Sequence, residues 1–75
     1  MPRLPALTAK EVIRALRKAG FIEDRQKGSH LVMWNPASHA LTVIPVHSGR
    51  TIKRPLLHGI LRDAKLSEPE FLKLL

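Results

Sequence analysis

The chain has 75 residues and no cysteine, and its 13 Lys and Arg against six Asp and Glu give it a net charge of +7. This length fits one domain, residues 1–75, that buries only about 60% of its unfolded surface, so apolar packing must stabilise it without disulfides or thiolate metal sites. No apolar run reaches the ~18 residues of a membrane span and residues 1–5 lead into no signal sequence, so we expect a soluble cytoplasmic protein. Because the chain is strongly basic, its expected partners are polyanions or acidic proteins.

The first predicted element is a helix over residues 8–19. Thr8 and Glu11 have the spacing of a capping box, apolar residues then recur at the helical period, and Gly20 can end the helix in a left-handed conformation. Its polar face is either simply solvated or able to follow a phosphate backbone. This face carries four basic residues, Lys10, Arg14, Arg17 and Lys18.

Three strands are predicted next, over residues 21–26, 30–35 and 41–46. Turn-forming residues separate them, so the strands should form an antiparallel meander, with Pro45 placing the third strand at an edge. Alternation puts His30, Val32 and Trp34 on one side of the middle strand and Leu31 and Met33 on the other, but the pattern alone does not say which side meets the helices. Trp34 is therefore either a core aromatic or a stacking residue on an open face.

A loop over residues 47–50 and the segment 51–54 lead into a second helix, with Pro55 in its first turn. Its buried stripe is predicted as Leu57, Ile60, Leu61 and Ala64. Gly59 within it indicates a close backbone contact or simple tolerance. Ser67 and Glu70 form a second capping box that opens a terminal helix through Leu75, with Phe71, Leu72 and Leu75 apolar. Helices covering one face of the sheet give a two-layer α+β domain with the other face open.

The segment Arg25-Gln26-Lys27-Gly28-Ser29-His30 carries the most informative chemistry. It places an imidazole at a tight turn among cations. Histidine is the side chain that exchanges protons near neutrality without a large perturbation, and the cations suit a phosphodiester.

Four segments of the chain, together spanning roughly residues 8–67, resemble the HicA toxin family. They are Leu16-Arg17-Lys18-Ala19-Gly20-Phe21, Arg25-Gln26-Lys27-Gly28-Ser29-His30, Val43-Ile44-Pro45-Val46-His47 and Ile60-Leu61-Arg62-Asp63-Ala64. The resemblance implies an α-β-β-β-α fold like that of double-stranded-RNA-binding domains, an mRNA-cleaving toxin, and neutralisation by a HicB antitoxin. It also implies that His30, in the Gly-Ser-His motif, is catalytic. The chain departs from the family where Leu56 and Leu57 follow Pro55 and where Lys65 replaces a common glycine.

RNA carries its own nucleophile, the 2′-hydroxyl next to the scissile phosphate, so a single base can start cleavage. His30 is the expected base, and Lys27, Arg50 and Lys53 are candidates to stabilise the charge that grows on the phosphorane. Ser29 either contacts a phosphate or shapes the turn. His47 either protonates the leaving 5′-oxygen or has an orienting or antitoxin-binding role. We expect no metal and no other cofactor, and a cyclic 2′,3′-phosphate product.

The four histidines do not predict a zinc site, because their spacings lack the close pairing of zinc ligands. His39 in a turn and His58 on a helix should face solvent. Two other functions stay open. One is a non-catalytic double-stranded-RNA binder that uses the four basic residues of the first predicted helix together with Lys53 and Arg54. The other is a protein-interaction module that uses Trp34 and the terminal helix. A HicB-like antitoxin should cover His30 and place acidic groups over the four basic residues of the first helix.

Overall fold

The computed structural model describes residues 4–47 and 49–75, so Met1–Arg3 and Ser48 of the predicted loop lie outside the described residues. In chain order the elements are β1 (Leu7–Thr8), α1 (Ala9–Lys18), β2 (Ile22–Lys27), β3 (His30–Trp34), β4 (Leu41–Pro45), β5 (Thr51–Ile52), α2 (Arg54–Ala64) and α3 (Glu68–Leu72). None of the described helices is long and apolar enough to cross a membrane.

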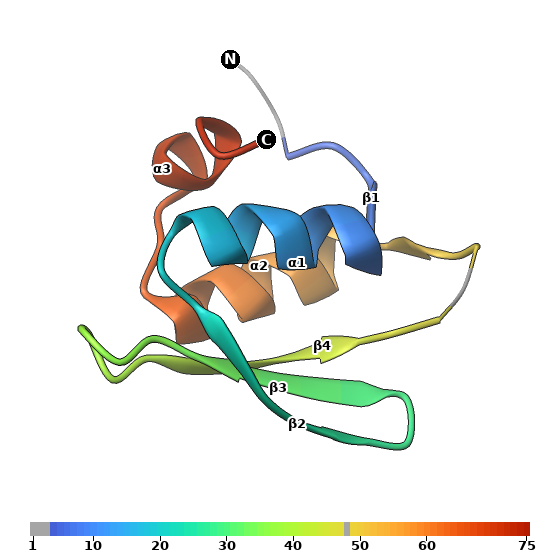
Figure 1. The fold of residues 1–75 in the computed structure, drawn as a ribbon. Helices are drawn as coiled ribbons and strands as arrows, with labels where there is room; N and C mark the ends of the chain where they lie inside the picture. Colours follow the sequence, from blue (N-terminus) through green and yellow to red (C-terminus); the bar gives the residue numbers. More distant parts are fainter. Residues whose placement is uncertain (1–3, 48) are drawn as a thin grey trace.

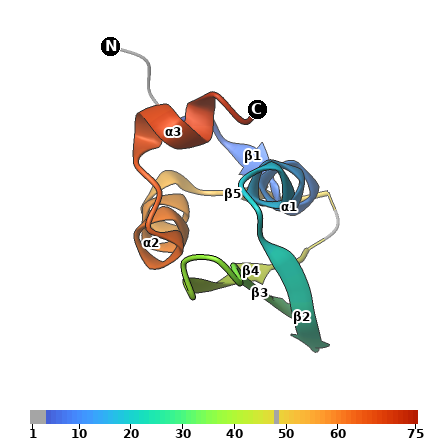
Figure 2. The ribbon, with the colours of Figure 1, turned by 60° about the vertical axis from the view of Figure 1, so that its left-hand side comes forward.

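The three-stranded sheet has the order β2-β3-β4, and both pairings are antiparallel. Helices α1 and α2 lie on one face of it, while the opposite face is open (Figures 1 and 2). The predicted two-layer α+β fold, the meander and the edge position of Pro45 are therefore confirmed.

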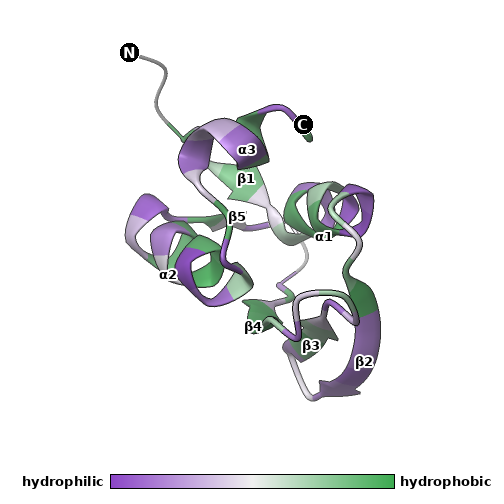
Figure 3. Cartoon of the chain, turned by 90° about the vertical axis from the view of Figure 1, so that its left-hand side faces the viewer, coloured by the Kyte–Doolittle hydropathy of each residue, from purple (hydrophilic) through white to green (hydrophobic). Residues whose placement is uncertain are grey.

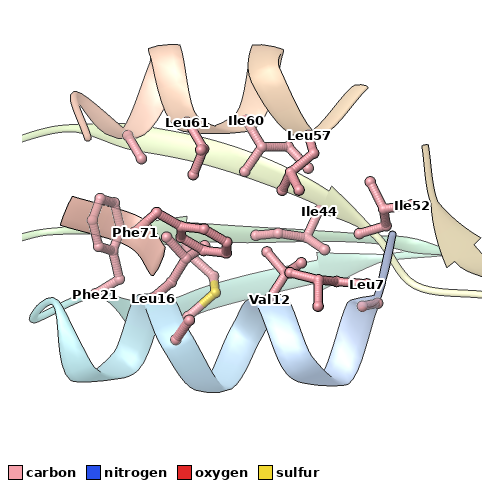
Figure 4. Close-up of a cluster of buried hydrophobic side chains, with 14 of the residues drawn as sticks. Leu7, Val12, Leu16, Phe21, Ile44, Ile52, Leu57, Ile60, Leu61 and Phe71 are labelled. Carbon is pink, nitrogen blue, oxygen red and sulfur yellow. The ribbon is translucent and has the colours of Figure 1, made fainter. Parts of the chain in front are cut away.

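The core fills the space between the sheet and the helices. Val12 and Leu16 of α1 meet Leu57 and Ile60 of α2 over Ile44 of β4 (Figure 4). The hydropathy colouring shows the same division, since the two helices turn apolar sides inward and β2 is mostly hydrophilic (Figure 3). All four residues of the predicted α2 stripe are buried.

Helix α3 closes the core from the side away from the sheet (Figure 2). Phe71 is fully buried, and its ring lies between the residues of α1 and α2 (Figure 4). The prediction of a helix through Leu75 is wrong at its end, because α3 stops at Leu72 and Leu75 is exposed. The apolar side of this helix thus belongs mainly to the core.

Two capping boxes begin α1 and α3, as predicted. Thr8 Oγ1 accepts from the Glu11 amide at 3.3 Å while Glu11 Oε1 accepts from the Thr8 amide at 3.0 Å, and Ser67 and Glu70 repeat the exchange. The bonds from the cap amide and hydroxyl favour the ionised carboxylates, so the pKa values of Glu11 and Glu70 both lie below the usual 4.5, although desolvation partly opposes this.

These lowered pKa values predict how stability depends on pH. The unfolded carboxyl groups bind protons at a higher pH than the folded ones, so the stabilisation is complete above pH 4.5 and is lost as the pH falls through the lower folded values. Urea midpoints measured across about pH 2–6 should therefore fall with acid, and less steeply in the double variant Glu11→Gln, Glu70→Gln. An equally steep fall in that variant would contradict this assignment.

Both long helices end in the same backbone pattern. After α1, Gly20 has φ 99°, its amide donates to the Arg17 carbonyl, and the Phe21 amide donates to the Leu16 carbonyl, each at 3.0 Å. This pair of bonds is the Schellman motif. After α2, Lys65 has φ 60° and makes the equivalent bond to the Arg62 carbonyl. A lysine thus occupies a left-handed position that favours glycine, in agreement with the departure seen in the sequence.

The small sheet β1-β5 was not predicted. Leu7 pairs with Ile52 and Thr8 with Thr51, so the segment before α1 lies against the segment before α2. Arg54 Nε strengthens this link by donating to the Leu4 carbonyl at 2.9 Å. Residues 50–53, which include β5, line a pocket together with Pro45 at the end of β4.

Gly59 is tolerated rather than required by a close backbone contact. A Cβ built on it would meet only the end of the Arg62 side chain, at 3.9 Å. The expected close approach of another backbone at this position is therefore wrong.

Candidate active site at the end of the sheet

His30 is the first residue of β3 and lies on the open face of the sheet. Leu31 and Met33 are buried against the helices, so the alternation of the strand turns His30, Val32 and Trp34 to the other side. His30 itself is exposed. This settles the orientation that the pattern left open.

Cross-strand neighbours define the surroundings of His30. In register, His30 has Lys27 of β2 on one side and Pro45 of β4 on the other. Side chains of directly paired residues share a face and have Cβ atoms about 4.5–5.5 Å apart. The Lys27 side chain therefore leaves the sheet on the same face as the imidazole, from a neighbouring position.

The turn before His30 has two residues, Gly28 and Ser29. Gly28 has φ 59°, and a Cβ there would meet nothing within 4 Å, so backbone conformation, not space, favours glycine. Glycine at the first position of a two-residue hairpin loop suits a type II′ turn. The Ser29 carbonyl accepts a hydrogen bond from the Val46 amide, which attaches the turn to the chain leaving β4. Ser29 thus has a structural role through its backbone, and a phosphate contact of its hydroxyl stays a prediction.

This attachment brings the loop after β4 to the same end of the sheet as His30 (Figure 1, right-hand side). His47, Arg50 and Lys53 line one pocket there, which we call the β4 pocket. Its other lining residues are Pro45, Thr51, Ile52, Pro55 and Leu56. Neither Lys27 nor His30 lines this pocket, so Arg50 and Lys53 are brought together with His47 and with Pro45, the register partner of His30.

A second depression, the α1 groove, lies between α1, β2 and the end of β4. Its walls include Lys10, Arg14, Arg17, Glu23 and His47. Arg17 forms an ion pair with Glu23, and both side chains are about half exposed, so the pair contributes at most about 1 kcal/mol. Lys10 and Arg14 share this groove with His47, while Lys18, in the last turn of α1, is not part of its lining.

Trp34 lies at the other end of the open face and is half-buried, not in the core. Its register partners are Ile22 and Leu41, two exposed apolar residues. The indole meets the ring of His39 edge to face, with centroids 6.3 Å apart. The open face is therefore apolar at the Trp34 end and basic at the His30 end.

The remaining predicted residues take other positions. Arg54 is engaged with the Leu4 carbonyl through Nε, so its guanidinium has a structural role whatever its part in RNA binding. His39 and His58 are exposed as expected, and His58 Nδ1 lies 3.1 Å from Glu68 Oε1. Among residues 4–47 and 49–75, no three His, Asp or Glu side chains are grouped so that they could hold a metal ion.

The apolar walls of the β4 pocket, Pro45, Ile52, Pro55 and Leu56, were not predicted from the sequence. Pro45 was expected at a strand edge, Ile52 in a connecting segment, and Pro55 with Leu56 at a helix start, so their meeting in one pocket depends on the tertiary fold. The two prolines within ten residues of each other were the one available signal.

One comparison with known proteins bears on this site. The model of the family described as HicA toxin of bacterial toxin-antitoxin matches residues 9–66, well over half of the chain. A search of curated proteins finds no match. The matched range contains His30, His47, all lining residues of the β4 pocket and all those of the α1 groove except Thr8, and it ends before α3.

Proposed function

Because the chain belongs to the HicA toxin family of bacterial toxin–antitoxin pairs, we propose that it is an endoribonuclease that cleaves mRNA with His30 as the general base. The observation that carries the proposal is the position of His30. It is an exposed imidazole at the start of β3, in register with Lys27 and beside the loop that bears His47. A polyanionic substrate also fits a chain with net charge +7.

The proposed reaction uses a nucleophile that the substrate supplies. His30 takes the proton of the 2′-hydroxyl, the 2′-oxygen attacks the adjacent phosphorus, and the bond to the 5′-oxygen breaks, leaving a 2′,3′-cyclic phosphate. Lys27 stabilises the charge that grows on the phosphoryl oxygens, and Arg50 and Lys53 can add to this from the β4 pocket.

His47 is the proposed partner in proton transfer. It lines both the β4 pocket and the α1 groove, so it can approach a substrate lying in either one. As a general acid it would protonate the 5′-oxygen as that bond breaks. Its alternative role is to position the RNA or to bind the antitoxin.

No step of this mechanism requires a metal ion, which makes metal removal a direct test. The purified chain should cut a defined single-stranded RNA at the same rate with and without an excess of chelator. The rate in chelator is measured by the fragments resolved on a gel. Loss of cleavage in chelator, restored by a divalent cation, would contradict the proposed mechanism.

The family implies an antitoxin partner. We propose that this partner is a HicB-like protein that covers His30 and places acidic groups over the basic face of α1. Lys10, Arg14, Arg17 and Lys18 are exposed on that face. Replacing all four with Gln should weaken the complex by about tenfold or more, because complementary charge is lost. Replacing Lys65 and Lys73, also exposed, with Gln removes two charges elsewhere and should change the affinity much less. If calorimetry finds that both variants bind the antitoxin with equal affinity, complementary charge on α1 does not stabilise the complex.

A further inference from the structure

The β4 pocket has a chemistry different from the rest of the basic surface. Its walls are apolar, formed by Pro45, Ile52, Pro55 and Leu56, and two cations, Arg50 and Lys53, belong to the same lining. Leu56 is 48% exposed although it is a large apolar residue in the first turn of a helix. An apolar pocket that includes cations suits a ligand with a flat apolar part joined to an anion.

The pocket is fixed in place by contacts on each side. β5 is paired with β1, so Thr51 and Ile52 are held in register with Leu7 and Thr8. On the other side, the buried Thr42 hydroxyl donates to the Ile60 carbonyl at 3.1 Å, which ties β4 to α2. The walls contributed by β4, β5 and α2 therefore stand in a defined arrangement before any ligand binds.

Pro45 connects the pocket to His30. Pro45 is both a wall of the pocket and the register partner of His30 on the neighbouring strand. Adjacent strands are about 4.8 Å apart, so the wall that Pro45 forms lies one strand from the backbone of His30. This is the scale of the step from a phosphate to the base of the nucleotide that carries it.

From this geometry, and resting on the ribonuclease function above, we propose that the β4 pocket binds one nucleobase directly next to the scissile phosphodiester and so selects where the RNA is cut. Arg50 and Lys53 contribute their charge to the scissile phosphate to which this nucleotide is joined. The apolar walls discriminate by the area of the base they cover, so the pocket favours a purine over a pyrimidine.

The first test compares oligoribonucleotides that differ only in the bases flanking one cleavable bond. The wild-type chain should cut beside a purine about tenfold faster, as kcat/KM, than beside a pyrimidine. Leu56→Ala should lower that ratio by about threefold or more, because it removes apolar contact area. The matched control is Leu75→Ala, since Leu75 is 47% exposed and outside the pocket lining, and it should leave the ratio unchanged. A wild-type ratio near one, or an unchanged ratio in Leu56→Ala, overturns the pocket assignment.

A second measurement keeps the pocket apart from the ribonuclease proposal. Methyl NMR of the full His30→Ala chain, titrated with adenosine 5′-monophosphate, should show saturable shifts at Leu56 and Thr51 but not at Leu75. Inorganic phosphate alone should leave the Leu56 methyls unchanged. If the wild type cuts no RNA but these shifts appear, the catalytic proposal fails and the base site stands. No shift at Leu56, or the same shift with inorganic phosphate, overturns the base site.

Discussion

Replacing His30 with alanine should lower the rate of RNA cleavage by about 10²–10⁴-fold, the range that one general base contributes. Expression of the wild-type chain should arrest growth, while His30→Ala should not. The loss should be purely catalytic because His30 is exposed at the open face, where truncation removes no core contact. Circular dichroism and the urea midpoint should therefore match those of the wild type.

A matched control is available in the turn after β3. His39 is also exposed, but it has φ 64° and lies at the Trp34 end of the sheet. His39→Asn keeps a residue that tolerates the left-handed conformation and should cleave RNA at the wild-type rate. Full activity in His30→Ala, or equal losses in the two variants, would contradict the role of His30.

His47→Ala separates the two readings of that residue. If His47 is the general acid, its replacement should lower kcat and remove the basic limb of the pH–rate profile. A positioning residue should mainly raise KM and leave the shape of the profile intact. A residue used only by the antitoxin should change neither.

The second large effect concerns stability. Phe71→Ala should destabilise the chain by about 3–5 kcal/mol, because it empties a fully buried aromatic site between α1 and α2. Small domains have little more stability than this, so the variant should be largely unfolded without denaturant. Urea unfolding followed by circular dichroism measures the loss.

Two further variants make the test graded. Phe71→Leu should cost less and give a measurable transition, and Leu75→Ala, at an exposed position, should change the free energy of unfolding by about 0.5 kcal/mol or less. Equal effects of Phe71→Ala and Leu75→Ala would mean that α3 is not part of the core. The prediction matters because α3 lies beyond the residues that match the family.

Local signals in the sequence were sufficient for the helices and the meander. Thr8 with Glu11 and Ser67 with Glu70 marked two helix starts because a capping box satisfies free amides within four residues. The burial of Leu57 and Ile60 followed from helical period alone.

Nonlocal pairing could not be read in the same way. The strands β1 and β5 have two residues each, too short for any alternation, and they pair across more than forty residues of sequence. The bulge between Glu23 and Arg25, which shifts the β2 register, also has no local mark. Alternation along β3 could not show whether Leu31 or His30 faces the helices, because this depends on which face of the sheet α1 and α2 cover.

The site was predicted in part for the same reason. His30, its turn and Lys27 are contiguous in sequence, and the structure places them together. His47, Arg50 and Lys53 share a pocket only in the folded chain, where the Val46 to Ser29 hydrogen bond and the β1-β5 pairing join distant segments. Pattern analysis could propose these residues but not the pocket they share.

The chemistry of the RNA ends tests the central claim most directly. Cleavage by the 2′-hydroxyl, started by His30, leaves a 2′,3′-cyclic phosphate on one fragment and a 5′-hydroxyl on the other. Mass spectrometry of the fragments made by the purified chain in chelator should find these two ends. Fragments with a 5′-phosphate and a free 3′-hydroxyl would show that water or another nucleophile attacked the phosphorus, and would contradict the account.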